Sequence, residues 1–132
     1  MISREECNCV ADLTATKKLN NEILILIRQM YHAERNMLVI GLTDVISSME
    51  QNLTDVIVLA ENATHLTTPL DFLTRLIKLA ETKGIPYIYA CKKEQLGRAC
   101  CIPSGISVVA VKRGPSYFSE KREDIKLAIK RV

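Results

Sequence analysis

The stretch 55-DVIVLA-60 decides the fold class of this chain. After its first residue the run is continuously apolar, and Val56, Ile57 and Val58 are β-branched. Such a run is typical of a strand in the middle of a sheet that is covered on both faces. The rest of the chain should therefore supply helices for two faces.

Working outward from this run, helical patterns alternate with short apolar runs. The expected strands cover residues 37–40, 55–60, 85–90 and 106–111. The expected helices cover residues 12–30, 42–49, 69–83 and 92–99, followed by a last helix that carries Ile125, Leu127 and Ile129. This order predicts an α/β domain, namely a three-layer α/β/α sandwich around a four-stranded mixed sheet.

Length and composition indicate one domain. The chain has 132 residues, 48% of them hydrophobic, with 5 glycines and 4 prolines, so residues 1–132 can bury one sizeable core. Residues 1–10 are expected to form a flexible N-terminal segment. No apolar run approaches the roughly 18 residues that cross a bilayer, and none resembles a signal peptide, so we expect a soluble intracellular protein without a membrane partner.

The cysteines are expected to be reduced thiols. There are 5 of them, an odd number, and intracellular chains seldom carry a disulfide framework. Cys7 and Cys9 form C-x-C, and Cys100 and Cys101 are adjacent. Neither spacing matches a structural zinc site, so no metal is expected.

Positive charge is concentrated at the C-terminal end. Residues 112–132 contain seven basic and three acidic side chains, a balance of +4 in a chain whose net charge is +3. This basic tail could contact phosphate, or it could be a solvated helix face with charge pairs along the helix.

Four segments are expected at one edge of the sheet, where binding sites of three-layer domains usually lie. They are Gly41, the loop after Ala60, residues 92–98 and the turn 101-CIPSG-105. Each lies at the corresponding end of a predicted strand, so the four segments should converge.

No catalytic constellation accompanies these segments. The only histidines are His32 and His65, neither beside a nucleophile. Cys91 and Cys100 are more typical of small buried hydrophobes. Asp44 should complement the dipole of the helix that begins after Gly41, and Thr43 should bond one of its free amides. A binding protein is therefore expected rather than an enzyme, with no cofactor and no small-molecule substrate.

Four blocks, in order, resemble the kink-turn-binding ribosomal protein family. They are 11-ADLTATKKLNNEILILI-27, 56-VIVLAENA-63, 84-GIPYIYACKKEQLGRAC-100 and 106-ISVVAV-111. The family includes large-subunit ribosomal proteins, the core protein of box C/D snoRNPs and the U4 particle, the Nhp-type H/ACA protein and the SECIS-binding domain. The stretches 38-LVIGLTDV-45 and 106–111 look nearer to the SECIS-binding branch, so the resemblance is mixed.

The resemblance implies an α/β/α sandwich that recognises a kink-turn, a sharply bent RNA with sheared G·A pairs and a flipped nucleotide. It implies a core component of a ribonucleoprotein particle: snoRNP, spliceosomal or ribosomal. The implied partners are this RNA and other particle proteins, with a monomer outside the particle. The implied location is the nucleus or nucleolus, with a ribosome-associated cytoplasmic protein as the alternative.

The resemblance also assigns RNA-contact residues. Gly41 matches the family glycine where backbone meets RNA, and Lys93, Arg98 and the apolar turn at Ile102 are retained. Four positions depart from the usual residue: Thr43 replaces asparagine, Asp44 replaces glutamate, Ser47 replaces lysine and Thr64 replaces the glutamate that would hold the flipped nucleotide.

Other departures remove positive charge. Val39 and Ile40 stand where basic residues are common, and Ser104-Gly105 replaces arginine-proline. Cys101 stands at a family glycine, a departure that does not change the charge. Because each lost cation removes a phosphate contact, RNA binding should be weaker and less salt-dependent than in a typical member.

An alternative function is a family-derived interaction scaffold that has lost strong RNA contact. Val39, Ile40 and Leu42 would favour it if they were exposed together, because such a patch usually marks a partner surface. If these three residues are buried, they are ordinary core.

Overall fold

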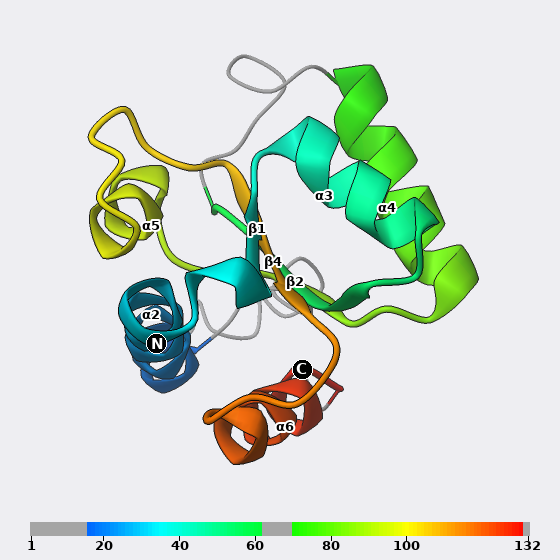
Figure 1. Ribbon diagram of the computed structural model, residues 1–132. Helices are drawn as coiled ribbons and strands as arrows, with labels where there is room; N and C mark the ends of the chain where they lie inside the picture. Colours follow the sequence, from blue (N-terminus) through cyan, green and yellow to red (C-terminus); the bar gives the residue numbers. More distant parts are fainter. Residues whose placement is uncertain (1–15, 62–69, 131–132) are drawn as a thin grey trace, which may run out of the picture.

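The computed structural model of the protein describes residues 16–61 and 70–130 (Figure 1). Its elements are α2 Lys17–Ala33, a 3-10 turn Arg35–Met37, β1 Leu38–Ile40, α3 Leu42–Glu50, β2 Thr54–Leu59, α4 Leu70–Lys83, β3 Tyr87–Tyr89, α5 Lys93–Ala99, β4 Val108–Lys112 and α6 Ser119–Lys130. The predicted alternation of helices and strands is confirmed. The expected flexible segment 1–10, Cys7, Cys9, Thr64 and His65 lie outside the described residues.

The four strands form one mixed sheet in the order β1-β4-β2-β3. β4 is antiparallel to both of its neighbours, β1 and β2, whereas β2 and β3 are parallel. The strands β1, β2 and β3 therefore all end at the same edge of the sheet. The two central strands are β2 and β4, and the three-residue strands β1 and β3 form the borders.

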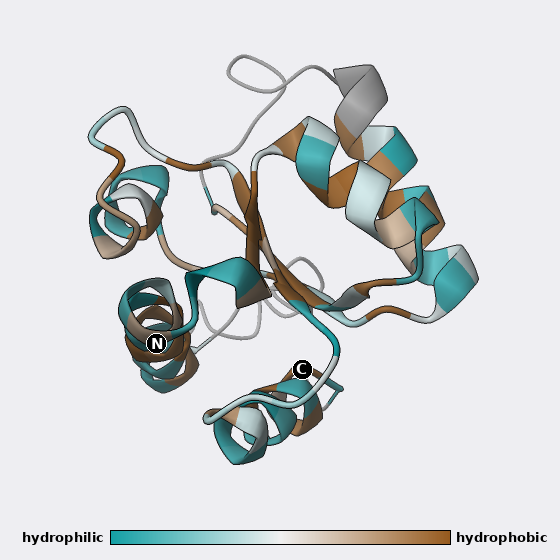
Figure 2. Cartoon of the chain, viewed as in Figure 1, coloured by the Kyte–Doolittle hydropathy of each residue, from teal (hydrophilic) through white to brown (hydrophobic). Residues whose placement is uncertain are grey.

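Side chains of the central strands alternate between two cores. Val56, Val58, Val109 and Val111 face the core covered by α2, α5 and α6. Ile57, Leu59, Val108 and Ala110 face the core covered by α3 and α4. Figure 2 shows these strands as apolar ribbon between helices whose outer faces are hydrophilic. The predicted three-layer sandwich is confirmed, and its middle layer is apolar on both sides because helices cover both faces.

The helices follow the predicted apolar stripes, with one exception. In α2, Leu19, Ile23, Ile27 and Met30 are all buried. In α6, Ile125 and Ile129 are buried, but Leu127 is 51% exposed. The expectation that Leu127 joins the stripe is wrong, because a residue two positions along a helix points to nearly the opposite side.

The C-terminal helix is held to the sheet by Asp55, which lies in a β-bulge. Thr54 pairs with Lys112 and Val56 with Val111, so Asp55 is the extra residue of β2. Its Oδ2 lies 3.0 Å from Nε of Arg122 and its Oδ1 lies 2.9 Å from Nζ of Lys126. The other two guanidinium nitrogens of Arg122 donate to the carbonyls of Lys112 and Gly114, both at 2.8 Å.

This cluster shows what two cations of the basic tail do. Arg122 is a buried side chain, and Lys126 is largely covered. Burial lowers the pKa of Lys126, but hydrogen bonds and charge from Asp55 and Glu123 outweigh it and raise the pKa overall. Both side chains bind Asp55 within the protein, so the interpretation as a solvated helix face does not hold for them, although Lys126 also forms a charge pair along the helix with Glu123.

Among the described helices, none combines the length and apolar character that a membrane crossing requires.

Replacement of Asp55 by asparagine should lower the free energy of unfolding by about 3 kcal/mol, because it leaves the buried charge of Arg122 without its counter-ion. Denaturation by urea measures this change. The matched control is Glu50→Gln, which removes the exposed ion pair between Glu50 and Arg75 and should cost at most about 0.5 kcal/mol. Equal losses in the two variants would contradict the structural role assigned to Asp55.

Candidate nucleic-acid interface

The described parts of the four segments predicted to converge meet at one edge of the sheet, with the loop after Ala60 represented by Glu61. The amide of Gly41 donates to the carbonyl of Val108 at 3.1 Å, and the amide of Ala60 donates to the carbonyl of Ser107 at 2.9 Å. The loops after β2 and β3 are joined because the amide of Glu61 donates to the carbonyl of Cys91 at 2.8 Å. We call this region, formed by Gly41 with the start of α3, residues 60–61, residues 91–98 and residues 101–107, the strand-end edge.

Gly41 joins β1 to α3 in a conformation that is essentially restricted to glycine. Its φ is 102° and its ψ is 146°, a region in which a side chain costs about 1–3 kcal/mol. A Cβ atom built at Gly41 would have no heavy atom within 4 Å apart from those of Gly41 itself and of its two chain neighbours. The glycine is therefore required by the backbone turn rather than by crowding, and it leaves the backbone open to an approaching ligand.

The first turns of α3 present three predicted site residues on one exposed face. Thr43, Asp44 and Ser47 are exposed, while Val45, Ile46 and Met49 are buried on the other face. Asp44 lies in the first turn, where its charge complements the helix dipole as expected. The expectation that Thr43 caps the helix is wrong, because Gly41 is the N-cap residue and no side chain bonds the free amides.

Ser47 is engaged by its own helix. Its Oγ accepts a hydrogen bond from Nε2 of Gln51 at 3.2 Å. A serine at this position is uncharged and, in this arrangement, already has a partner.

The apolar residues around Gly41 pack inward. Ile40 packs against the core of α2, α5 and α6, and Val39 and Leu42 pack against the core of α3 and α4. All three are half-buried rather than exposed. Because they pack against the two cores, they do not form the exposed apolar patch that would have favoured an interaction scaffold.

A second glycine, Gly97 in α5, determines how closely the turn 101–105 packs against that helix at the strand-end edge. Its carbonyl accepts a hydrogen bond from the amide of Ile102 at 2.7 Å. A Cβ atom at Gly97 would lie 2.4 Å from the carbonyl oxygen of Ile102 and 2.8 Å from Cα of Gly105. Only glycine lets the turn 101–105 rest directly on α5. Gly97 is not among the site residues predicted from the sequence, although a glycine inside a helical pattern often marks such a close approach.

The remaining predicted residues lie on α5 and on this turn. Arg98 is exposed in the last turn of α5. Lys93 is half-buried, and its carbonyl accepts from the amide of Ile106 at 3.1 Å. Ile102 is also half-buried and packs against the core of α2, α5 and α6. The structure thus brings Gly41, Thr43, Asp44, Ser47, Lys93, Arg98 and Ile102 to the strand-end edge.

Three cysteines surround the start and the end of α5. Cys91 and Cys100 are buried, as expected, and Cys101 is exposed. Burial, together with the charge of Glu61, raises the pKa of the Cys91 thiol to about 12. Burial, with a further contribution from Cys101, raises the pKa of the Cys100 thiol to about 11. Neither buried thiol is suited to act as a nucleophile at neutral pH.

The backbone conformation at Cys101 is one that favours glycine, the residue that the family resemblance implies at this position. Its φ is 58°, in the left-handed region that glycine adopts without penalty. This chain therefore carries a residue with a side chain at a left-handed backbone position.

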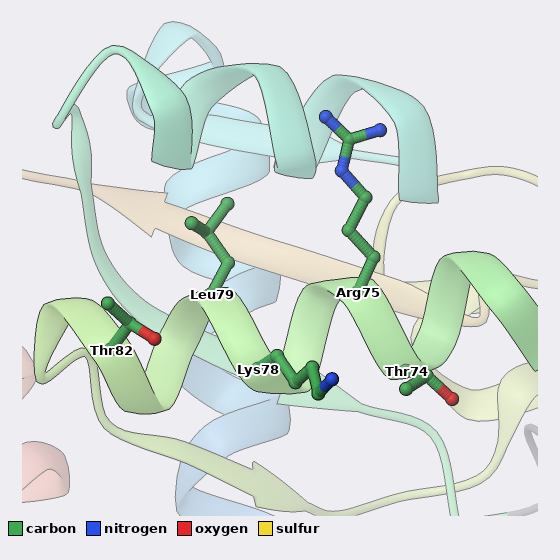
Figure 3. A pocket seen from close by; sticks show the side chains of 5 residues that line it. All are labelled: Thr74, Arg75, Lys78, Leu79 and Thr82. Atoms are coloured by element: carbon green, nitrogen blue, oxygen red, sulfur yellow. The ribbon is translucent and has the colours of Figure 1, made fainter.

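An open groove lies along α4, among residues that do not belong to the strand-end edge. It is lined by Thr74, Arg75, Lys78, Leu79 and Thr82, all from that helix (Figure 3). The side chain of Arg75 extends toward α3, where it pairs with Glu50. Within the described part of the chain, no three histidine, cysteine or acidic side chains are grouped so that they could hold a metal ion.

Residues 22–116 match the model of the ribosomal protein L7Ae/L30e/S12e/Gadd45 family. The chain belongs to this family. The match covers all four strands and confirms the resemblance carried by the sequence blocks.

Individual relatives agree with this assignment. An NHP2-like protein 1 homolog of Drosophila melanogaster is 32% identical over 107 residues, which cover 81% of this chain and 80% of the relative. H/ACA ribonucleoprotein complex subunit 2 of the same organism is 29% identical over 122 residues, which cover 89% of this chain and 72% of the relative. The second of these relatives is named as a ribonucleoprotein subunit, in agreement with the expectation of a binding protein rather than an enzyme.

A solved structure shows the same fold. The Giardia lamblia 15.5kD RNA binding protein superposes with a TM-score of 0.72 over 90% of this chain and 91% of its own, at 19% sequence identity. The two proteins therefore share the α/β/α fold.

Thiol labelling should distinguish the three described cysteines. At pH 8, about one in 10,000 Cys91 side chains and about one in 1,000 Cys100 side chains would be thiolate, given their raised pKa values. Iodoacetamide should therefore modify Cys101 in the native protein, and Cys91 and Cys100 only after unfolding, as measured by peptide mass mapping. Rapid native labelling of Cys91 would contradict its burial.

Replacement of Cys101 by glycine should raise the free energy of unfolding by about 0.5–1 kcal/mol, because relief of the left-handed backbone outweighs the extra entropy of the unfolded chain. Thermal and urea denaturation measure the gain. The control Cys101→Ala removes the thiol but keeps the strained backbone, so it should leave stability nearly unchanged. Equal stability of the two variants would show that the backbone is not strained.

Proposed function

We propose that this protein binds a kink-turn RNA through its strand-end edge, as a component of a ribonucleoprotein particle. The observation that carries the proposal is the open backbone at Gly41 beside the exposed first turns of α3. A bent RNA is recognised largely by its shape, which requires a surface where backbone and short polar side chains approach closely. Family membership and relatives named as ribonucleoprotein proteins support the same function.

Each side of the edge contributes a different kind of contact. Asp44 is exposed in the first turn of α3, where its carboxylate can accept hydrogen bonds from a guanine edge. Arg98 is exposed in the last turn of α5 and supplies positive charge for a phosphate. Thr43, Ser47 and Lys93 complete the polar part, and Ile102 supplies apolar surface. Thr64 is retained as a candidate contact although it lies outside the described residues.

The charge balance of this edge predicts moderate affinity. Ser47 is neutral, Val39 and Ile40 face the cores, and Arg122 and Lys126 bind Asp55 elsewhere. Few cations are left to neutralise phosphates, so the affinity should fall with salt less steeply than it does for proteins that make many phosphate contacts.

The proposed setting is a snoRNP, spliceosomal or ribosomal particle. The protein would be a monomer outside the particle and would contact other particle proteins within it. A nuclear or nucleolar location is favoured by the relatives named as H/ACA subunits.

Binding to a kink-turn RNA should exceed binding to the same RNA with its tandem G·A pairs replaced, because the replacement removes the bend. Electrophoretic mobility shifts with the full chain at several salt concentrations measure the preference. Equal binding to the two RNAs, or none, would exclude the proposal and leave the interaction scaffold as the remaining function.

Substitutions at the edge should separate affinity from selectivity. Arg98→Ala should weaken binding to all RNAs by about tenfold and reduce the salt dependence. Asp44→Ala should lower the preference for the kink-turn by about tenfold. The matched control is Arg35→Ala, which removes an exposed arginine just before β1, at the opposite end of that strand from Gly41. If Arg35→Ala weakens binding as much as Arg98→Ala, the contact surface is placed wrongly.

A further inference from the structure

Asn20 on α2 links two loops of the strand-end edge. Its Oδ1 accepts a hydrogen bond from the amide of Cys91 at 3.2 Å, in the loop after β3. Its Nδ2 donates to Oε2 of Glu61 at 3.3 Å, in the loop after β2. Its backbone carbonyl accepts from Sγ of Cys91 at 3.5 Å. The three residues form a closed ring, because the amide of Glu61 also donates to the carbonyl of Cys91.

The chemistry of the ring requires an amide side chain in this orientation. A backbone amide only donates, so the atom that meets Cys91 is the side-chain oxygen. The carboxylate of Glu61 only accepts when it is ionised, so the atom that meets it is the side-chain nitrogen. Asparagine satisfies both loops with one donor and one acceptor, which neither aspartate nor leucine does.

The ring acts at a residue with an uncommon backbone conformation. Cys91 has a φ of 66°, in the left-handed region that is unfavourable for a residue with a side chain. Such a conformation persists only where surrounding contacts hold it. Because α5 begins two residues later, at Lys93, the backbone of Cys91 sets the direction in which Lys93 and Arg98 are presented.

The ring also restrains a negative charge. Glu61 is exposed, and a carboxylate near this edge repels phosphate. Its bond to Asn20 ties it to α2. Loss of the donor would release the carboxylate beside the proposed RNA.

We propose that Asn20 is a positioning residue for RNA recognition, which fixes the loops at Glu61 and Cys91 so that α5 meets the RNA in a single orientation. This inference rests on the proposed kink-turn binding. Asn20 need not touch the RNA itself, because it acts through Cys91 and Glu61.

The central experiment compares Asn20→Ala with Asn21→Ala. Asn21 is the exposed neighbour on the same helix, so both substitutions change helix propensity equally. Asn20→Ala should weaken kink-turn binding by about tenfold, the change that corresponds to the loss of one or two hydrogen bonds, and should leave binding to the RNA without G·A pairs unchanged. Asn21→Ala should bind both RNAs like the wild type.

A rescue variant reverses the donor and the acceptor. Asn20→Asp alone places two carboxylates face to face and should bind no better than Asn20→Ala. In the double variant N20D/E61Q, one aspartate oxygen accepts from the Cys91 amide and the other accepts from the new glutamine. Kink-turn affinity should then return to within about threefold of the wild type. Persistent loss in the double variant would overturn the proposal.

Hydrogen exchange gives a readout that needs no RNA. The amide of Cys91 should exchange faster in Asn20→Ala, whereas the amide of Ala90, which donates to the carbonyl of Leu59 at 2.8 Å, should keep its protection. Equal acceleration at both amides would indicate general destabilisation and overturn the positioning role.

The outcomes separate the two proposals. A wild-type protein that does not distinguish the two RNAs overturns both. A wild-type protein that does distinguish them, with an Asn20→Ala variant that binds equally well, overturns the role of Asn20 alone.

Discussion

The antiparallel pairing of β2 with β4 is the interaction on which the rest of the structure depends. These two strands occupy the middle of the sheet, and their side chains alternate between the two cores. Each helix layer packs on this pair. Because β4 runs against β2, the turn that precedes β4 is brought beside the loop that follows β2. The central pairing therefore builds the core and gathers the strand-end edge at the same time.

Local sequence patterns were sufficient for the elements and their layers. The run Val56–Ala60 predicted a strand covered on both faces, and the stripe from Leu19 to Met30 predicted the buried face of α2, because burial imposes a period that the sequence displays directly. The order of the strands was not predictable in this way. Nothing local to residues 106–111 indicates that β4 lies between β1 and β2, because that position depends on pairing with distant residues.

The site was predictable where it depends on strand ends and unpredictable where it depends on side chains from other elements. Gly41 was a candidate because it stands at a recognisable junction of strand and helix, whereas Arg98 was a candidate through the resemblance to the family. The contacts of Asn20 with Glu61 and Cys91 join residues 41 and 71 positions apart, and no spacing in the sequence signals them. The bulge at Asp55 and its ion pairs with α6 were not predictable for the same reason. An acidic residue at the start of a strand does not indicate which distant residues it will contact.

The two outermost strands of the sheet limit how readily another chain can pair with its backbone. β1 and β3 contain three residues each, and a glycine in a conformation foreign to strands follows β1 directly. A border strand this short presents few unpaired backbone N–H and C=O groups to another chain. It is therefore a poor template for edge-to-edge association or fibril growth. The two borders of the sheet therefore offer little surface for self-association through backbone pairing.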